Sequence, residues 1–253
     1  MQFLPLYTKS GADLTRPSAS DAEPIATYRG HTAPITSVLV SSPLKLVFSA
    51  SLDSSIRIWT LPDPSRDPYG PYEPATSVQT LVGHTEAIWD LRLLPSRASF
   101  AAPKTARDPS PRLASCSADG SVRIWARNGT TGQWTLESTI NDFPQGVVPT
   151  CLGVYHSDYT KVLVGLSNGL VALYDCDTRR QVATVGCELG FIRALRSVFV
   201  SFADCGIASE QTSQVNSVLS HPTESIIVGG YEDGYIRTFD SETCEFHFTL
   251  AHV

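Results

Sequence analysis

Two sets of histidine, serine and aspartate residues in this sequence have the side chains that acyl transfer requires. The sets share one order along the chain and each ends on a tryptophan: His31, Ser49, Ser51, Asp53 and Trp59 in the first, and His84, Ser115, Ser117, Asp119 and Trp125 in the second. In a hydrolase, a carboxylate orients a histidine that takes the proton of a serine hydroxyl. A domain needs such a centre once, whereas here the whole set recurs with its tryptophan. We therefore interpret both sets as hydrogen-bonded scaffold, in which either serine could take part, and we predict no catalytic residue and no enzyme.

A β-hairpin is expected to position each set. The segment Leu113–Trp125 has two short apolar runs around an Asp-Gly pair, which is typical of a tight turn. The same pattern recurs at Val47–Trp59 and, more weakly, at Val162–Tyr174 and Val228–Phe239. A Gly-His dipeptide followed by a hairpin that ends on tryptophan resembles one blade of a WD40 β-propeller.

These repeats predict an all-β fold, an incomplete WD40 β-propeller of about four four-stranded blades. We expect residues 1–24 to be a flexible leader and residues 25–253 to be the partial propeller. The repeats are expected at about 30–60, 83–126, 147–176 and 214–241, with insertions at 95–112 and 187–208. The second insertion leaves three interpretations open: an amphipathic helix, an extra strand pair, or a retained intron in the gene model.

The third repeat departs from the first two. Asn168 takes the place of the turn aspartate and Tyr174 that of the tryptophan, while Val164 and Leu166 replace the two serines. No Gly-His dipeptide precedes this repeat. We therefore expect this blade to lack the polar set and to rely on apolar packing.

Composition and charge exclude several classes of function. The net charge of −6 and the pI near 5.5 argue against a nucleic-acid partner. The sequence has no glycine-rich phosphate loop and no metal-ligand spacing, so we expect no cofactor and no metal. It has no run of 18 apolar residues and no secretory signal, which argues against direct membrane insertion. The scattered cysteines are expected to be reduced thiols in the cytoplasm.

Three longer segments narrow the resemblance. They are Gly83–Trp89 (GHTEAIW), Asp67–Pro74 (DPYGPYEP) and Val215–Thr223 (VNSVLSHPT). Together they resemble the C-terminal WD40 domain of the striatin family, over roughly residues 25–252 without the two insertions. Such a propeller has seven blades, so we expect a fragment, a truncated gene model, or pairing with another chain that covers the open ends of the array.

The resemblance implies a non-catalytic scaffold, a regulatory subunit of type 2A protein phosphatase that organises a phosphatase–kinase signalling assembly. The implied partners are the phosphatase scaffold and catalytic subunits, a Mob-family protein and germinal-centre kinases, in the cytoplasm or at the periphery of endomembranes. In that family a coiled coil N-terminal to the propeller dimerises and holds the phosphatase, so oligomers would form through regions absent from this sequence. The alternative is a WD40 adaptor of another complex, in ubiquitin ligation or vesicle traffic.

Partners are expected to dock where the hairpin turns and the connections into the inner strands share one face. The candidate residues on this rim are Ala33, Pro34, Leu52, Glu86, Ala87, Ala118 and Glu232. Trp89 lies in an expected inner strand, and we predict that it belongs to the core.

Overall fold

The computed structural model describes residues 27–62, 77–94, 111–186, 213–243 and 246–250. Within these ranges sixteen strands form four antiparallel sheets of four strands each. Blade 1 contains β1 (Ile35–Ser41), β2 (Leu46–Ser51), β3 (Ser55–Thr60) and β4 (Ser77–Val82). Blade 2 contains β5 (Ile88–Leu94), β6 (Arg112–Ser117), β7 (Val122–Arg127) and β8 (Trp134–Ile140). Blade 3 contains β9 (Pro149–Val154), β10 (Lys161–Leu166), β11 (Leu170–Asp175) and β12 (Arg180–Gly186). Blade 4 contains β13 (Val215–Ser220), β14 (Ile226–Tyr231), β15 (Ile236–Asp240) and β16 (Phe246–Leu250).

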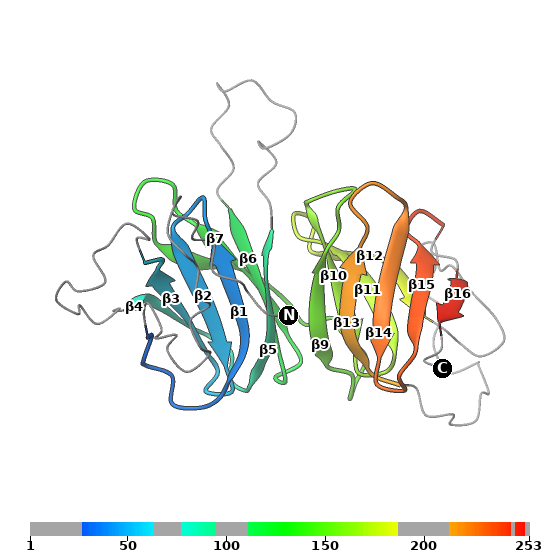
Figure 1. Cartoon of the computed structure of the whole chain (residues 1–253), viewed down its shortest axis with the longest axis horizontal. Helices are drawn as coiled ribbons and strands as arrows, with labels where there is room; N and C mark the ends of the chain where they lie inside the picture. The colour runs from blue at the N-terminus through cyan, green and yellow to red at the C-terminus, as the bar shows by residue number, and fades with distance from the viewer. Residues whose placement is uncertain (1–26, 63–76, 95–110, 187–212, 244–245, 251–253) are drawn as a thin grey trace, which may run out of the picture.

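The four sheets follow one another in space as they do in sequence (Figure 1). The first strand of each blade is the inner strand, and β1 packs on β5, β5 on β9, and β9 on β13. This arrangement confirms the predicted fold class, an all-β propeller built from four four-stranded blades. No helix among the described residues could span a membrane.

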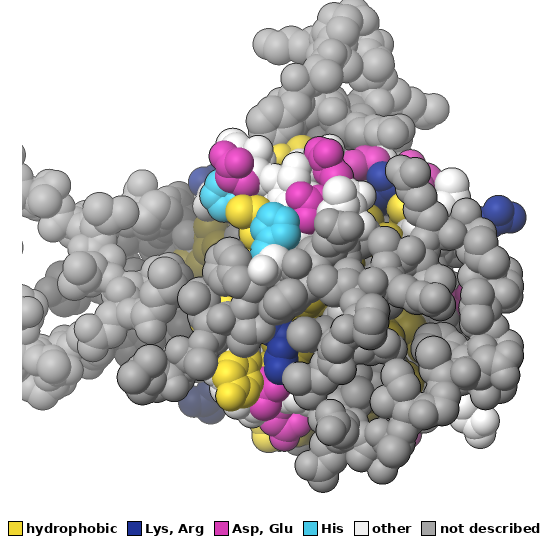
Figure 2. Space-filling model, turned by 90° about the vertical axis from the view of Figure 1, so that its right-hand side faces the viewer, with side chains coloured by type: hydrophobic (Ala, Val, Ile, Leu, Met, Phe, Trp, Pro, Cys, Tyr) yellow, Lys and Arg dark blue, Asp and Glu magenta, His cyan; other side chains and the backbone are white. Residues whose placement is uncertain are grey.

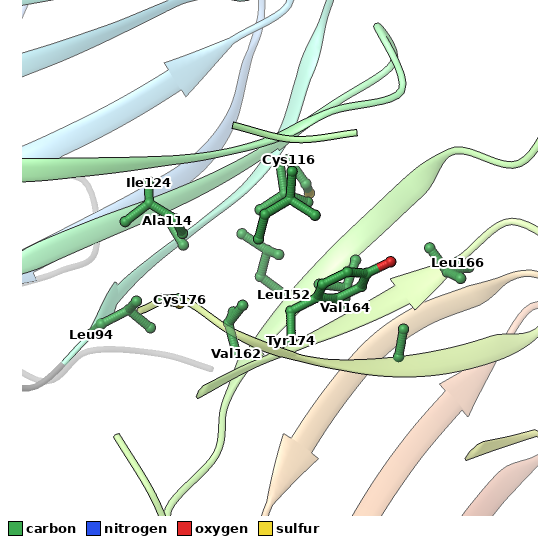
Figure 3. Close-up of a cluster of buried hydrophobic side chains, with 13 residues drawn as sticks. Leu94, Ala114, Cys116, Ile124, Leu152, Val162, Val164, Leu166, Tyr174 and Cys176 are labelled. Atoms are coloured by element: carbon green, nitrogen blue, oxygen red, sulfur yellow. The ribbon is translucent and has the colours of Figure 1, made fainter. Parts of the chain in front are cut away.

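Buried apolar side chains fill the three spaces between blades. Phe48 and Ile58 of blade 1 meet Leu113 and Trp125 of blade 2. Figure 3 shows the cluster between blades 2 and 3, to which Leu94, Ala114, Cys116, Ile124, Leu152, Val162, Val164 and Tyr174 contribute. Blades 3 and 4 meet through another cluster, which includes Leu163, Val171, Val218 and Phe239. Because each interface is closed by side chains from both sheets, consecutive blades stabilise one another.

The tight turn between the second and third strands of each blade needs a left-handed residue. Gly120, Gly169 and Gly234 take this position in blades 2 to 4, with φ of 75°, 81° and 82°. Blade 1 places Ser54 there, with φ of 61°. A side chain in this region costs conformational energy that glycine avoids, so the turn of blade 1 is the strained one.

The two outward faces of the array are less covered than the faces between blades. Val38 and Val40 on β1 are 55% and 61% exposed, and Leu219 on β13 is 60% exposed. On β1 these valines alternate with Ser37 and Leu39, which face blade 2. Because side chains alternate between the two faces of a strand, one apolar face of blade 1 and one of blade 4 lie outside the interfaces between the described blades.

Two predicted boundaries change. Arg112 is not part of an insertion but begins β6, where it pairs with Leu94 and its guanidinium binds Glu137 and Asp177 at 2.7 and 2.6 Å. The outer strands β8 and β12 lie between the predicted repeats, because an outer strand precedes the next repeat in sequence but pairs with the blade before it. The predicted leader and the insertion at 187–208 lie outside the described residues.

Candidate functional site

The His-Ser-Asp-Trp set of blade 2 forms one continuous hydrogen-bonded chain. Trp125 Nε1 donates to Ser115 Oγ at 3.0 Å, and Ser115 Oγ lies 2.8 Å from His84 Nε2. His84 Nδ1 lies 2.9 Å from Asp119 Oδ2. Since the tryptophan can only donate and the carboxylate can only accept, the serine donates to Nε2 and the histidine donates from Nδ1. Every polar atom along this buried path therefore has a partner.

Blade 1 repeats this geometry almost atom for atom. His31 Nδ1 lies 2.9 Å from Asp53 Oδ2, and His31 Nε2 lies 2.7 Å from Ser49 Oγ. Trp59 Nε1 donates to the same Ser49 Oγ at 2.9 Å. The tertiary structure thus decides which serine joins the histidine, a choice that the sequence left open.

The second serine of each set has a different task. Ser117 Oγ donates to the carbonyl oxygen of Glu86 at 3.1 Å and accepts from the amide of Asp119 at 3.2 Å. In blade 1, Ser51 makes the corresponding bonds at 3.0 and 3.1 Å. These serines tie the hairpin turn to the segment that leads into the inner strand.

A third serine, which was not among the predicted members, completes each set. Ser121 Oγ donates to Asp119 Oδ1 at 2.6 Å, and Ser55 Oγ donates to Asp53 Oδ1 at the same distance. The amide of Thr85 also donates to Asp119, at 3.1 Å. The available signal was the spacing Asp-x-Ser in both repeats, since a turn aspartate commonly bonds to groups two residues ahead.

These partners determine the charge state of the set. Burial opposes ionisation of Asp119, but hydrogen bonds from Ser121, His84 and Thr85 outweigh it and hold the pKa of Asp119 below its usual value. The same balance lowers the pKa of Asp53. Burial lowers the pKa of His84, more strongly than its aspartate partner raises it. A neutral imidazole beside a carboxylate is therefore the favoured state in blade 2.

The glycine of each Gly-His dipeptide makes room for an arginine and the tryptophan. A Cβ atom on Gly83 would lie 2.5 Å from Arg123 Nη1 and 3.2 Å from the Trp125 ring. A Cβ atom on Gly30 would meet the corresponding arginine and tryptophan of blade 1 at 2.7 and 3.2 Å. In each Gly-His dipeptide, the histidine therefore donates a hydrogen bond to the turn aspartate. The glycine allows the arginine and the tryptophan to approach the backbone closely.

The arrangement resembles a catalytic triad but does not present a nucleophile. Ser115 is fully buried and Ser49 is 4% exposed, and each hydroxyl oxygen already accepts a hydrogen bond from a tryptophan. Acyl transfer needs a serine that reaches the substrate and donors at the developing oxyanion. No group of three or more metal-ligating side chains occurs among the described residues. The sets therefore act in the fold, as scaffold.

Blades 3 and 4 fill the same positions differently. In blade 3, Val164 and Tyr174 are buried in place of the serine and the tryptophan, as predicted from the sequence. In blade 4, the turn aspartate Asp233 is held by Arg237, which reaches its two carboxylate oxygens at 3.2 and 2.6 Å. The guanidinium of Arg237 also lies over the Tyr231 ring, 4.3 Å from its centroid.

One backbone hydrogen bond recurs at the same edge of all four blades. In each, the amide after the second strand donates to a carbonyl just before the inner strand, at 2.9 to 3.0 Å. The paired residues are Leu52 with Pro34, Ala118 with Ala87, Ser167 with Val148, and Glu232 with Gln214. We call this edge the rim, and include Ala33, Glu86 and Trp89 beside these pairs. The predicted docking residues thus share one edge of the molecule.

The predicted rim residues differ in how accessible they are. Pro34, Leu52, Glu86 and Glu232 are exposed. The three alanines, Ala33, Ala87 and Ala118, are half-buried. Their role in docking stays a prediction, with the exposed four better placed to contact a partner.

Trp89 is a rim residue, and its prediction as core is wrong. The register of β5 against β6 shifts between Ile88 and Asp90, so Trp89 is the extra residue of a β-bulge. Its side chain is 42% exposed, whereas Ile88 is fully buried. A bulge turns one side chain out of the alternation that a regular strand imposes. The bulge could not be read from the apolar pattern around Trp89.

The opposite edge of the blades has another chemistry. Figure 2 shows acidic and histidine side chains gathered at one end of the blade 4 side of the molecule. In the turns at the end of blade 4 away from the rim, His221, Glu224 and Glu242 are exposed, and Ser225 Oγ donates to Glu242 Oε1 at 3.0 Å. The rim also has exposed acidic groups, Glu86 and Glu232, but it adds the large apolar side chains of Leu52 and Trp89.

Comparison with known proteins agrees with this architecture. The family model "WD domain, G-beta repeat" matches residues 22–60, 75–126 and 206–240. A crystal structure of the WD40 β-propeller domain of Doa1 superimposes with a TM-score of 0.61 at 17% identity, covering 92% of this chain and 58% of that one. At that identity the likeness concerns the fold alone.

Sequence relatives are more specific. Human striatin-3 is 31% identical over 92% of this chain, mouse striatin 30% over 96%, and mouse striatin-4 29% over 93%. The aligned part is 25% to 27% of those proteins, so the chain spans about a quarter of the length of the curated relatives it matches. The fold and these relatives point to a non-catalytic protein-interaction scaffold. The WD40 repeats and these relatives are consistent with a striatin-family WD40 region.

Proposed function

We propose that this chain is the docking propeller of a striatin-like regulatory subunit of type 2A protein phosphatase, and that its rim holds other members of a phosphatase–kinase assembly. The candidates are the phosphatase scaffold and catalytic subunits, a Mob-family protein and germinal-centre kinases, in the cytoplasm or at the periphery of endomembranes. The identity to striatins over nearly the whole chain supports the family role. The observation that carries the site is the exposed indole of Trp89 on the rim.

The rim supports docking because it combines apolar exposure with a rigid base. Trp89 and Leu52 are 42% and 39% exposed, and large apolar or aromatic side chains of this kind anchor protein interfaces. The hydrogen-bonded sets hold the turns beneath them, so little entropy is lost when a partner binds. Glu86 and Glu232 add exposed acidic groups, which favour a partner with basic residues around an apolar centre.

Binding of purified partners to rim variants tests the proposal. The full chain is immobilised, and the phosphatase scaffold–catalytic pair, a Mob-family protein and a germinal-centre kinase are passed over it separately. Trp89→Asp and Leu52→Asp should each weaken binding of at least one partner by tenfold or more. Leu136→Asp on β8 and Val182→Asp on β12 are matched controls, because these side chains are 45% and 46% exposed away from the rim.

The outcomes separate the family role from the site. Binding that survives both rim variants but fails in a control would move the docking surface to the outer strands. If none of the three partners binds the unaltered chain, the phosphatase role is wrong. Recovery of ubiquitin-ligase or vesicle-coat subunits from a lysate would then favour the adaptor alternative. Circular dichroism of each variant shows whether a loss reflects unfolding.

A further inference from the structure

The first and the last described blades each turn one sheet face away from the other blades. We call the face of blade 1 that carries Val38 and Val40 the leading face, and the face of blade 4 that carries Leu219 and Ile236 the trailing face. These four side chains are 45% to 61% exposed. Both faces lie on the broad side of a sheet, whereas the rim lies at the strand ends, so they are separate from the proposed docking surface.

The leading face has apolar residues at positions that other blades bury. Val38 takes the inner-strand position of Leu91 in blade 2 and of Val218 in blade 4, as the registers of the three sheets show. Leu91 and Val218 are fully buried against the preceding blade, whereas Val38 is exposed. A blade that ends an array without a neighbour needs a polar outer face. The valines therefore indicate a face that another blade covers.

The trailing face of blade 4 shows the same contrast. Ile236 takes the position of Ile56 in blade 1 and of Val122 in blade 2, and both of these are fully buried against the following blade. Each interface in the described part of the chain packs the trailing side of one sheet on the leading side of the next. The trailing face of blade 4 therefore fits a leading face such as that of blade 1.

A hydrogen bond repeats across two of these interfaces. The inner strands of blades 1 and 3 each have a β-bulge near their start, and the extra residue is Thr36 in blade 1 and Thr150 in blade 3. Thr36 Oγ1 donates to the carbonyl of Ile88 in blade 2 at 2.6 Å. Thr150 Oγ1 donates to the carbonyl of Val215 in blade 4 at 2.5 Å. The bulge residue thus links its blade to the first residue of the following inner strand.

Blade 4 carries a donor that would continue this pattern. Its bulge residue is Asn216, which is exposed and whose side-chain oxygen accepts from Gln214 Nε2 at 3.1 Å. The side-chain N–H groups of Asn216 make no hydrogen bond with the described residues. The carbonyl equivalent to those of Ile88 and Val215 is that of Ile35, the first residue of β1. Asn216 would therefore meet Ile35 if a blade 1 followed blade 4.

We propose that two copies of this chain form a closed ring, in which the leading face of each copy packs on the trailing face of the other. A second copy fits both faces because it carries one of each kind and covers them at the same time. The pair is two-fold symmetric, so assembly stops at two copies. Four blades from each copy give a ring of eight, within the range of β-propellers. The rim stays free, so the ring does not depend on the proposed phosphatase role.

The mass of the chain in solution tests the ring. Light scattering after gel filtration should give twice 27.4 kDa for the unaltered chain. Val38→Asp and Leu219→Asp should each weaken association about tenfold or more, because each buries a carboxylate without a partner in both interfaces. Leu136→Asp and Val182→Asp, on the outer strands, are controls that should remain dimeric. Trp89→Asp should also remain dimeric, which separates this result from binding at the rim.

Mixing the two face variants shows which faces meet. Val38→Asp leaves the trailing face intact, and Leu219→Asp leaves the leading face intact. A mixture should therefore form mixed pairs through one undamaged interface, although each variant alone is monomeric. Native mass spectrometry, with one variant labelled with ¹⁵N, identifies the mixed pair.

Three results would overturn the proposal. A monomeric chain at about 100 μM would show that the two faces lack useful affinity for each other. A dimer that survives both face variants, or face variants that form no mixed pair, would show that the leading face does not meet the trailing face. A mass that rises beyond two copies would show growth without closure. Val40→Asp and Ile236→Asp replace any face variant that circular dichroism shows to be unfolded.

Discussion

Blades 1 and 2 have the same four-stranded architecture as blades 3 and 4. The two pairs differ in the chemistry of their interiors. At the position of Ser115 in blade 2, blade 3 has Val164 and blade 4 has Gly229. Where blade 2 satisfies its turn aspartate with a buried histidine, blade 4 uses Arg237, which is nearer to solvent. The fold therefore requires that the polar groups of each turn have hydrogen-bond partners and that side chains fill each interface between blades. A polar set is one of several ways to meet both requirements.

The location of the sets makes the difference matter. Ser115 is fully buried, and Trp125, to which it bonds, belongs to the cluster between blades 1 and 2. The next interface, between blades 2 and 3, is built from apolar side chains around Val164 and Tyr174 (Figure 3). A polar set inside an interface is stabilising only when complete, because each lost member leaves a buried group without a partner. We therefore expect the removal of any one member of the set to destabilise blade 2.

Truncation of Trp125 should reduce the free energy of unfolding more than the other changes proposed below. Trp125→Ala removes a side chain that is 3% exposed and a donor to Ser115, and should cost about 3–5 kcal/mol of unfolding free energy. Urea denaturation measures the loss. Trp89→Ala, at the exposed rim tryptophan, is the control and should cost less than about 1 kcal/mol. Equal costs for the two variants would contradict the blade 2 interface.

A reciprocal exchange tests the interior chemistry itself. Ser115→Val leaves His84 Nε2 and the Trp125 indole without a partner, and should destabilise by about 1–3 kcal/mol. Val164→Ser buries a hydroxyl in the apolar interface of blade 3 and should cost a similar amount, about 1–3 kcal/mol. Thermal unfolding of both variants measures these effects. If either exchange is neutral, the two interiors are interchangeable and the comparison fails.

Acid should weaken blade 2 in two steps. The pKa of His84 is lowered from 6.5 in the folded state, so the unfolded chain binds more protons and stability falls as the pH drops through 6.5 towards the folded pKa. The lowered pKa of Asp119 adds a second loss, as the pH falls from 3.8 through its folded value. Urea midpoints between pH 8 and pH 4 measure the first step.

His84→Asn is the control for that step. This variant should be less stable at neutral pH, because it loses the hydrogen bonds of His84, and its urea midpoint should vary less than that of the unaltered chain between pH 7 and pH 5. The same slope in both proteins would show that another group titrates in this range.

The smallest expected effect lies in the turn of blade 1. Ser54→Gly gives this turn the residue that the other three blades have, and relieves a φ of 61°. The gain should be below about 1 kcal/mol, because glycine also loses more entropy on folding. A rise in the melting temperature of a few degrees is expected. Gly120→Ser, the reverse change in blade 2, should lower it, and a rise there would contradict the argument.

The sequence by itself determined the fold class, the number of blades, and the histidine, aspartate and tryptophan of each polar set. These features are local: alternating apolar runs predict strands, Asp-Gly pairs predict turns, and the distance from aspartate to tryptophan is the same in both sets. Even the apolar character of blade 3 followed from Val164 and Tyr174, because both occupy positions defined by a nearby turn.

Only the tertiary structure decided the features that depend on a neighbouring strand or blade. It selected Ser49 and Ser115 over Ser51 and Ser117, because the choice depends on which serine faces a histidine that is distant in sequence. It turned Trp89 outward, because a bulge arises from the register between two strands. It also enclosed the Trp134 indole between two blades. Local pattern specifies the strand, whereas the partner strand decides what each side chain meets.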